Sequence, residues 1–211
     1  MGALIRARLV IVAGMVLILA IGIGAISAYK TPPPPATAQL IQAWPADSSL
    51  VRDPVTPTLI MFAHPRCECT KGSLIQLRDL MPRLEGRVRP YILFAKSKGG
   101  PEASPTENQT LAASIPGVTI LPDDAAQEAD RFGVTTSGQI VLYDAGGRLL
   151  FSGGIAPLHE YQGETPLVRG LLAAVASASG ESAPGAQVQM PNAVFGCALH
   201  GKGNAPETPG D

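Results

Sequence analysis

Three cysteines are the residues of this sequence best suited to do chemistry. Cys67 and Cys69 are separated by one residue, and Cys197 lies far along the chain. In an oxidising compartment an odd number of cysteines leaves one thiol over, or indicates a metal site or a reactive site. Three are also too few for a disulfide framework. The count therefore favours thiol chemistry over structural cross-linking.

The two neighbouring cysteines lie in the polar segment HPRCECTK, residues 64–71. The apolar run of residues 58–63 predicts a buried strand directly before it. Leucines at helical spacing predict a helix over residues 70–84 directly after it. Both cysteines then lie where a strand ends and a helix begins, and the unpaired N–H groups and partial positive charge of a helix start favour a thiolate.

Charged side chains beside the cysteines also affect the ionisation of the thiols. Arg66 and Lys71 favour a thiolate, whereas Glu68 partly opposes them. We therefore expect a cysteine pKa below the ordinary value at this junction. His64 is placed to assist proton transfer or to tune the charge of the thiols.

The rest of the domain alternates between strand and helix patterns. Further strands are expected over residues 88–95, 118–121, 138–143 and 148–151, and further helices over residues 106–115, 123–132 and 165–178. The resulting order, βαβαβαββα, predicts an α/β domain over residues 51–178 with a parallel part and a terminal antiparallel hairpin.

This order of elements resembles the thioredoxin superfamily, which implies a mixed central sheet flanked by helices. When Phe62 is placed on the aromatic residue that ends the family's first strand, Cys67 falls on the nucleophilic cysteine. Residues 132–143 then match the segment leading into the loop that faces the motif. The segments HPRCECT, TSGQ and VFGC further resemble a bacterial, membrane-anchored subgroup called RedB.

Several positions depart from the thioredoxin pattern. The cysteines are spaced C-x-C and not C-x-x-C, and Arg66 replaces the tryptophan before the nucleophile. Gly138 falls where the family has a cis-proline, and Met61 falls where it has a buried acid. These departures argue against a general thioredoxin-like reductase, but they leave a thiol-based site intact.

The resemblance implies thiol–disulfide exchange without a cofactor. Cys67 would attack as the thiolate and form a mixed disulfide, which Cys69 or Cys197 would then resolve. Arg66, Lys71 and Gly138 would support the site. The partner would be a client or electron-donor protein that carries a thiol or a disulfide.

A metal site is the alternative prediction. The sequence offers three thiols and two imidazoles, a set that suits Cu(I) or Zn(II): His64, Cys67, Cys69, Cys197 and His200. Some thioredoxin-fold proteins outside the cytoplasm deliver copper with two cysteines and a histidine. The alternative function is therefore copper or zinc binding and delivery on the same scaffold.

Composition and charge narrow the class of protein. A formal net charge of −1 and a pI near 6.3 argue against a nucleic-acid binder. A mean hydropathy of +0.18 with only 16% charged residues excludes disorder of the whole chain.

The first 30 residues predict a membrane anchor. Residues 9–28 form an uncharged run that, as a helix, would reach ~30 Å, the thickness of the hydrocarbon core. Arg6 and Arg8 place the N-terminus in the cytoplasm, and the domain in the periplasm or outside the cell. A cleaved signal peptide is the alternative. A proline-rich linker is expected over residues 31–50.

The tail after the last predicted helix is rich in Gly, Pro, Ala and Ser. We expect residues 179–211 to be mostly unstructured. An apolar island over residues 194–199 contains Cys197, and we expect it to dock on another surface.

Overall fold

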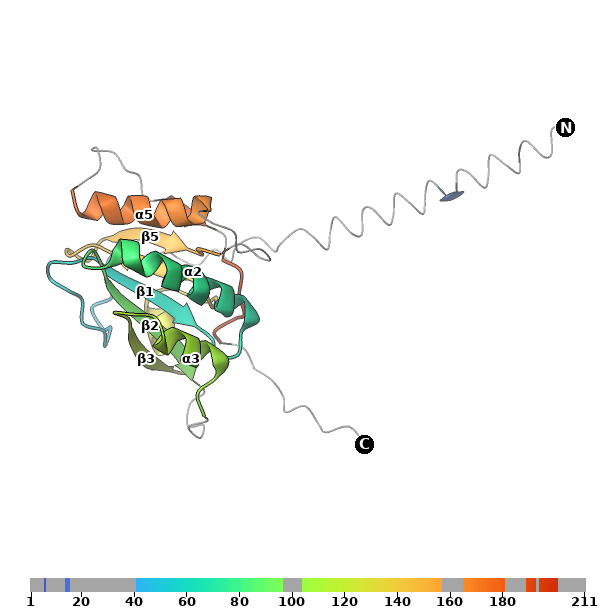
Figure 1. Cartoon of the computed structure of the whole chain (residues 1–211), viewed down its shortest axis with the longest axis horizontal. Helices are drawn as coiled ribbons and strands as arrows, with labels where there is room; N and C mark the ends of the chain where they lie inside the picture. The colour runs from blue at the N-terminus through green and yellow to red at the C-terminus, as the bar shows by residue number, and fades with distance from the viewer. Residues whose placement is uncertain are drawn as a thin grey trace. The chain divides into compact units, whose positions relative to one another are not determined.

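A computed structural model describes residues 41–96, 104–156, 165–180, 189–192 and 194–200, and besides these only Arg6, Gly14 and Met15 (Figure 1). Almost all of the predicted anchor lies outside these residues. No helix in the described part is long and apolar enough to span a bilayer. The membrane anchor stays a prediction.

The domain is built on one mixed sheet of six strands. They are β1 (Thr58–Ala63), β2 (Arg89–Lys96), β3 (Thr119–Asp124), β4 (Ile140–Tyr143), β5 (Leu149–Gly153) and β6 (Gln189–Asn192). The strand order is β3-β2-β1-β4-β5-β6. The first three strands are parallel, β4 runs antiparallel to β1, and β5 runs antiparallel to β4. This is the thioredoxin-like fold that the element order predicts.

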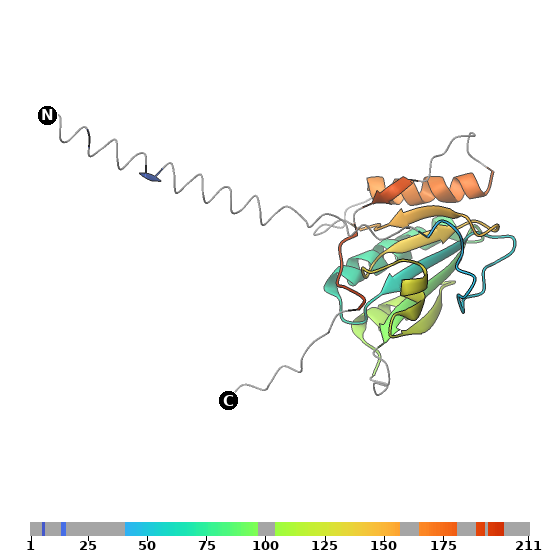
Figure 2. The same ribbon diagram turned by 180° about the vertical axis from the view of Figure 1, so that it is seen from behind.

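Helices cover both faces of the sheet. They are α2 (Glu68–Leu84), α3 (Glu107–Ala113), α4 (Gln127–Arg131) and α5 (Pro166–Ala178). Figure 1 shows α2, α3 and α5 over one face, and Figure 2 shows α4 over the other. Alternate side chains of β1 serve the two faces, as the strand period of two requires. Leu59 and Met61 pack under α2 and α5, whereas Ile60 and Phe62 pack on the α4 side.

An aromatic cluster forms the centre of the α4 side. Phe132 lies 5.1 Å from Trp44, 5.8 Å from Phe62 and 5.6 Å from Tyr143, measured between ring centroids. Phe62 and Tyr143 come from β1 and β4, and Phe132 caps the carboxyl end of α4. The cluster therefore joins the sheet, the helix and the segment before β1.

The segment before β1 differs from the predicted linker. Residues 41–50 pack against the domain, with Trp44 in the aromatic cluster and Leu50 buried. The Tyr143 hydroxyl donates to the Ile41 carbonyl at 2.7 Å, and the Trp44 N–H donates to the Gly147 carbonyl at 2.7 Å. The predicted linker therefore ends too late, at residue 50. The contact was missed because few apolar residues mark it in the sequence.

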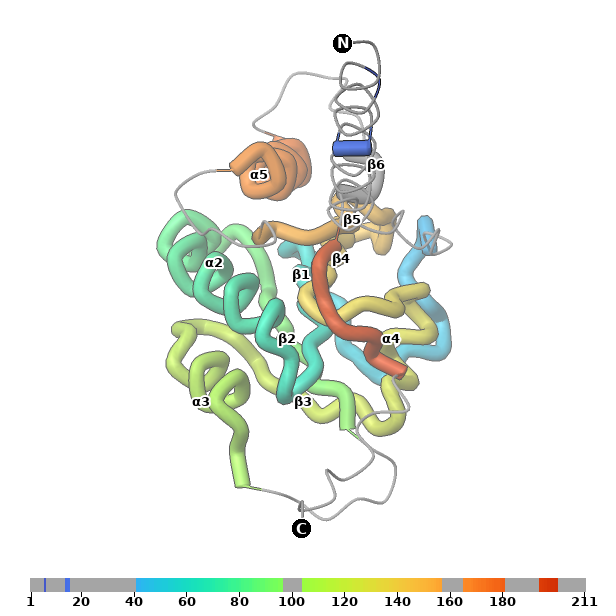
Figure 3. The backbone as a smooth tube through the Cα atoms, turned by 90° about the vertical axis from the view of Figure 1, so that its right-hand side faces the viewer, coloured from blue at the N-terminus to red at the C-terminus, as the bar shows by residue number. Residues whose placement is uncertain are grey.

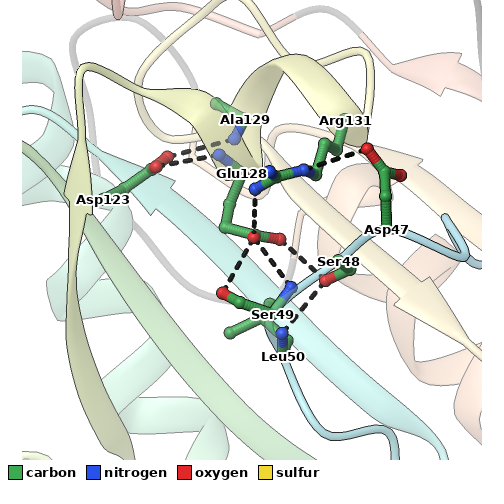
Figure 4. Close-up of polar contacts among 8 residues, drawn as sticks. All are labelled: Asp47, Ser48, Ser49, Leu50, Asp123, Glu128, Ala129 and Arg131. Atoms are coloured by element: carbon green, nitrogen blue, oxygen red, sulfur yellow. Dashed lines mark hydrogen bonds and ion pairs between the residues drawn. The ribbon is translucent and has the colours of Figure 1, made fainter.

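A buried carboxylate fastens this segment to α4 (Figure 4). Glu128 accepts hydrogen bonds from the Ser48 hydroxyl at 2.7 Å and from the Ser49 N–H and hydroxyl at 2.9 Å each. Arg131 pairs with Glu128 at 2.6 Å and with Asp47 at 3.1 Å. A buried charge is retained where such partners compensate it, so this network holds residues 47–49 in place.

The helix expected over residues 123–132 is shorter than predicted. Asp123 and Asp124 belong to β3, and α4 begins only at Gln127. The Asp123 carboxylate accepts the N–H groups of Glu128 at 2.8 Å and Ala129 at 3.0 Å (Figure 4). The acid therefore caps the helix start from the preceding strand and is not part of the helix itself.

The tail contributes a strand that the sequence did not suggest. β6 lies parallel to β5 at the edge of the sheet, with Gln189 opposite Phe151 and Asn192 opposite Gly153. The expectation that residues 179–211 are mostly unstructured is wrong for β6 and for residues 194–200, which are described next. Residues 181–188, 193 and 201–211 of the tail lie outside the described part.

Candidate functional site

Cys67 lies at the junction of β1 and α2, where the sequence predicts the site. It is the N-cap residue of α2, and its side chain is fully buried. Its N–H donates to the His64 carbonyl at 3.2 Å. From α3, the buried Asn108 amide donates to the Cys67 carbonyl at 2.9 Å and lies 3.5 Å from the His64 carbonyl. These contacts fix the turn that carries the cysteine.

The apolar island of the tail docks on the domain, as expected, and the surface that it contacts is this site. We call Val194–His200 the docked segment. It lies antiparallel to the residues leading into β4, with Ala198 opposite Thr136. The Ser137 N–H donates to the Cys197 carbonyl at 2.8 Å, and the Leu199 N–H donates to the Thr135 carbonyl at 2.9 Å. Figure 3 shows the segment in red, running past β4 toward α4.

Docking brings Cys197 to the sulfur of Cys67. The Cys197 N–H donates to Cys67 Sγ at 3.2 Å. The Cys69 thiol is exposed on the first turn of α2, and the charge of Cys67 opposes its ionisation. Cys197 is therefore the cysteine whose backbone contacts Cys67 Sγ.

The pKa of Cys67 is set by burial against hydrogen bonding. Burial acts to raise it, because a thiolate is poorly solvated inside the protein. Hydrogen bonding by Cys197 and Thr70 outweighs burial, so the pKa of Cys67 lies below the ordinary value. The direction agrees with the sequence-based expectation, but these contacts, not Arg66 and Lys71, account for it.

The other two thiols have pKa values above the ordinary value. Burial raises the pKa of Cys197 to about 12, with further contributions from its hydrogen bond to Cys67 and from the charges of Cys67 and Cys69. Burial and the charge of Cys67 also raise the pKa of Cys69. Cys67 is therefore the thiol of the three that ionises first as the pH rises.

Two buried hydroxyls link this sulfur to the loop before β4. Thr70 Oγ1 hydrogen-bonds to Ser137 Oγ, and Ser137 Oγ accepts the His64 N–H at 2.6 Å. Ser137 therefore ties the loop before β4 both to α2, through Thr70, and to the backbone at His64.

The predicted supporting residues have mixed positions. Burial, and then the charge of Arg66, lower the pKa of His64, which keeps its imidazole neutral at pH 7. Lys71 pairs with Glu107 of α3, so its charge is partly neutralised before it can act on the sulfur. Gly138 has φ +89°, and a Cβ there would lie 3.0 Å from Ser73 Oγ. Glycine at this position therefore permits close packing of the β4 loop against α2.

The five residues of the metal alternative do not come together. His200 Nε2 lies 2.7 Å from Asp130 Oδ1 on α4, and the His64 ring nitrogen Nδ1 accepts the Arg66 N–H at 3.3 Å. Within the described ranges no group of three or more His, Cys, Asp or Glu side chains has a metal-binding arrangement. Metal binding by this chain stays a prediction.

Sequence reasoning missed three residues that surround Cys67. Thr70 was visible only as the residue one helical turn after Cys67, and Ser137 only as the neighbour of Gly138. Asn108 carried no signal, because its role depends on how α3 packs against α2. Each of these three side chains is buried and polar, which is the feature that identifies them in three dimensions.

The ionisation of Cys67 can be measured directly. We expect the first thiolate to appear, by its ultraviolet absorbance, with a midpoint below the ordinary cysteine pKa of about 8.5. Thr70→Val should raise that midpoint by about one pH unit, since a hydrogen bond to a charged group contributes about 1.5–3 kcal/mol. The exposed Thr110→Val is the matched control and should leave it unchanged. A wild-type midpoint at or above the ordinary value would contradict this assignment.

Comparisons with known proteins support the fold. No protein-family model matches the sequence, and no curated protein matches it. An uncharacterized conserved protein from Geobacillus kaustophilus has a similar structure, with a TM-score of 0.55 and 19% identity over 83% of this chain and 96% of its own. A hypothetical protein from Sinorhizobium meliloti 1021 aligns with a TM-score of 0.49 and 20% identity over 81% and 96%.

A secreted disulfide oxidoreductase from Mycobacterium tuberculosis, described as homologous to E. coli DsbE, aligns more weakly. Its TM-score is 0.41, with 16% identity over 58% of this chain and 81% of its own. At these identities the similarity to solved structures bears on the fold alone.

Proposed function

We propose that this protein carries out thiol–disulfide exchange at Cys67. The observation that carries the proposal is the buried Cys67 Sγ at the start of α2, which accepts the Cys197 N–H at 3.2 Å and whose thiol has a lowered pKa. The thiolate is the form of cysteine that attacks disulfides. A buried cysteine with a purely structural role would need neither a neighbouring thiol nor hydrogen bonds that favour its thiolate form.

The first step consumes the thiolate of Cys67. It attacks one sulfur of a client disulfide, the client S–S bond breaks, and one client thiolate leaves with the electron pair. The product is a mixed disulfide between Cys67 and the client. Cys67 then carries no charge and so no longer raises the pKa of Cys197 through its charge. The attack thereby makes the next thiol more acidic.

The second step uses Cys197. Its thiolate attacks Cys67 Sγ, the mixed disulfide breaks, and the second client sulfur leaves as a thiolate that takes up a proton. The client disulfide is reduced by two electrons, and the protein is left with a Cys67–Cys197 disulfide. The leaving client thiolate takes up the proton that Cys197 loses, and we assign this transfer to His64, whose lowered pKa favours a neutral imidazole. The reverse sequence oxidises a dithiol client.

Cys197 is preferred over Cys69 as the resolving thiol. Cys67 and Cys69 are two residues apart at the start of a helix, where side chains point to different faces, and accordingly Cys67 is buried while Cys69 is exposed. The backbone of Cys197, by contrast, is hydrogen-bonded to Cys67 Sγ at 3.2 Å. The docked segment therefore holds its thiol at the sulfur it must attack.

A redox titration of the full chain tests the assignment. In glutathione buffers of graded potential, cysteine mapping by mass spectrometry should show one two-electron step that joins Cys67 to Cys197 and leaves Cys69 as a thiol. Metal analysis of the same sample tests the copper or zinc alternative. Absence of any reversible cysteine pairing would contradict thiol–disulfide exchange.

We place this activity on the outer side of the cytoplasmic membrane, in line with the RedB resemblance. The proposal is supported by the apolar run of residues 9–28 and the arginines before it. The full chain should then stay in the membrane fraction after alkaline carbonate extraction, while a chain lacking residues 1–30 should not. Release of the full chain by carbonate would contradict an uncleaved anchor.

A further inference from the structure

The docked segment behaves as an extended peptide bound to the domain. Its backbone exchanges hydrogen bonds with Ser137 and Thr135, each shorter than 3 Å, and Ala198 pairs with Thr136. Such pairing adds a strand to an exposed backbone edge, which is a recurring way in which proteins bind peptides. The peptide in this case belongs to the same chain and presents a cysteine to Cys67.

Two side-chain positions in the docked segment are tightly constrained. A Cβ at Gly196 would lie 1.8 Å from the Ser137 carbonyl oxygen, so only glycine fits directly before the cysteine. Leu199, two residues after the cysteine, is 7% exposed and packs in the cluster that contains Phe62 and Phe132. The edge therefore selects glycine before the cysteine and an apolar residue two positions after it.

The same contacts cover the reactive sulfur. Cys67 is fully buried, yet it must meet a client sulfur, and one of the groups against it is the backbone of Cys197. A client cysteine that reaches Cys67 along the Thr135–Ser137 edge would need the place that the docked segment occupies. Because the segment is tethered, its effective concentration is on the order of millimolar, and it competes strongly with free partners.

We propose that the docked segment holds the place of a client: a client must displace it from Thr135–Ser137 to meet Cys67, and the segment must return there for Cys197 to resolve the mixed disulfide. The client must itself be an extended peptide with glycine before its reactive cysteine. This inference rests on the proposed thiol–disulfide exchange and names the partner chemistry of that site. The partner is a protein segment of the pattern Gly–Cys–x–apolar, of which Gly196-Cys197-Ala198-Leu199 is the internal copy.

The test separates access from chemistry with two disulfide probes. One is the peptide Val-Phe-Gly-Cys-Ala-Leu, its cysteine joined to a chromogenic thiol; the other is hydroxyethyl disulfide, which is too small to need the edge. In each reaction the Cys67 thiolate breaks the probe disulfide and releases one thiolate, whose appearance gives the rate. The reduced full chain is compared with Gly196→Val, which should evict the docked segment, and with the matched control Ala198→Val, whose exposed side chain should leave it docked.

We expect Gly196→Val to accelerate the peptide reaction by about tenfold or more. In the wild type the docked segment should leave the Thr135–Ser137 edge open in only about 10% or less of the molecules, which limits the rate. The gain with hydroxyethyl disulfide should be clearly smaller, and Ala198→Val should behave as the wild type. Leu199→Asp should reproduce the effect by a different route, because it would place a charge among apolar side chains.

The peptide sequence gives an independent readout. In Gly196→Val, a probe with valine in place of its glycine should react about tenfold more slowly than the glycine probe, because its side chain meets the Ser137 carbonyl. Equal rates for the two peptides, or equal gains for the peptide and hydroxyethyl disulfide, would overturn the client-mimic proposal. Failure of every variant to react with hydroxyethyl disulfide would instead overturn thiol exchange at Cys67.

Discussion

Replacement of Cys67 by serine is expected to lower the rate of disulfide exchange by at least about a thousandfold, because the hydroxyl is a far weaker nucleophile than the thiolate. Cys197→Ser should retain the attack of Cys67 but lose its resolution, so a mixed disulfide with the client or the peptide probe accumulates. Non-reducing electrophoresis and mass spectrometry would detect that adduct.

Cys69→Ser is the matched control for this pair of variants. Its thiol is exposed, and its replacement should leave turnover largely intact if Cys197 resolves the mixed disulfide. Accumulation of the adduct in Cys69→Ser and not in Cys197→Ser would assign resolution to the C-x-C pair. Undiminished exchange by Cys67→Ser would exclude Cys67 as the nucleophile.

Removal of the central aromatic ring should give the largest loss of stability. Phe132 is 2% exposed and contacts Trp44, Phe62 and Tyr143 at centroid distances below 6 Å. Phe132→Ala is expected to cost about 3–5 kcal/mol of unfolding free energy, from lost burial and the cavity left behind. Urea unfolding monitored by fluorescence measures it, and Trp44 is the single tryptophan of the chain and lies against the ring.

The control for this variant is Val55→Ala. Val55 is 82% exposed, so its truncation should change the unfolding free energy by no more than about 0.5 kcal/mol. A cost of less than about 1.5 kcal/mol for Phe132→Ala would lie below the range for buried aromatic residues and contradict the packing of this cluster.

Elements with a strong local pattern were predictable from the sequence. The strand over residues 58–63 agrees with β1, and the helix predicted over residues 165–178 agrees with α5 to within one residue. β6 was missed because four residues, QMPN, have no periodicity and contain a proline. The packing of residues 41–50 was missed for a related reason, since Trp44 and Leu50 are isolated apolar residues in a polar stretch.

The site was predictable in its chemistry but not in its contacts. The cysteines at the end of β1 and the apolar island around Cys197 both stand out in the sequence. The lowered pKa of Cys67 was expected from nearby positive charges, whereas Lys71 is engaged by Glu107 of α3. Hydrogen bonds from Thr70 and Cys197 depend on residues 3 and 130 positions away, and only the folded chain brings the second of these to the sulfur.

Because Cys67 and Cys197 are 130 residues apart, the redox state of the site affects the stability of the whole domain. A disulfide between them would close a loop that contains most of the sheet and all four helices of the described part. In the chain-entropy treatment, closing a loop of this length lowers the conformational entropy of the unfolded chain and so stabilises the folded state by about 5 kcal/mol. The oxidised protein should therefore melt at a higher temperature than the reduced one. Each turnover would then alternate the domain between a more stable, cross-linked state and a less stable, reduced state.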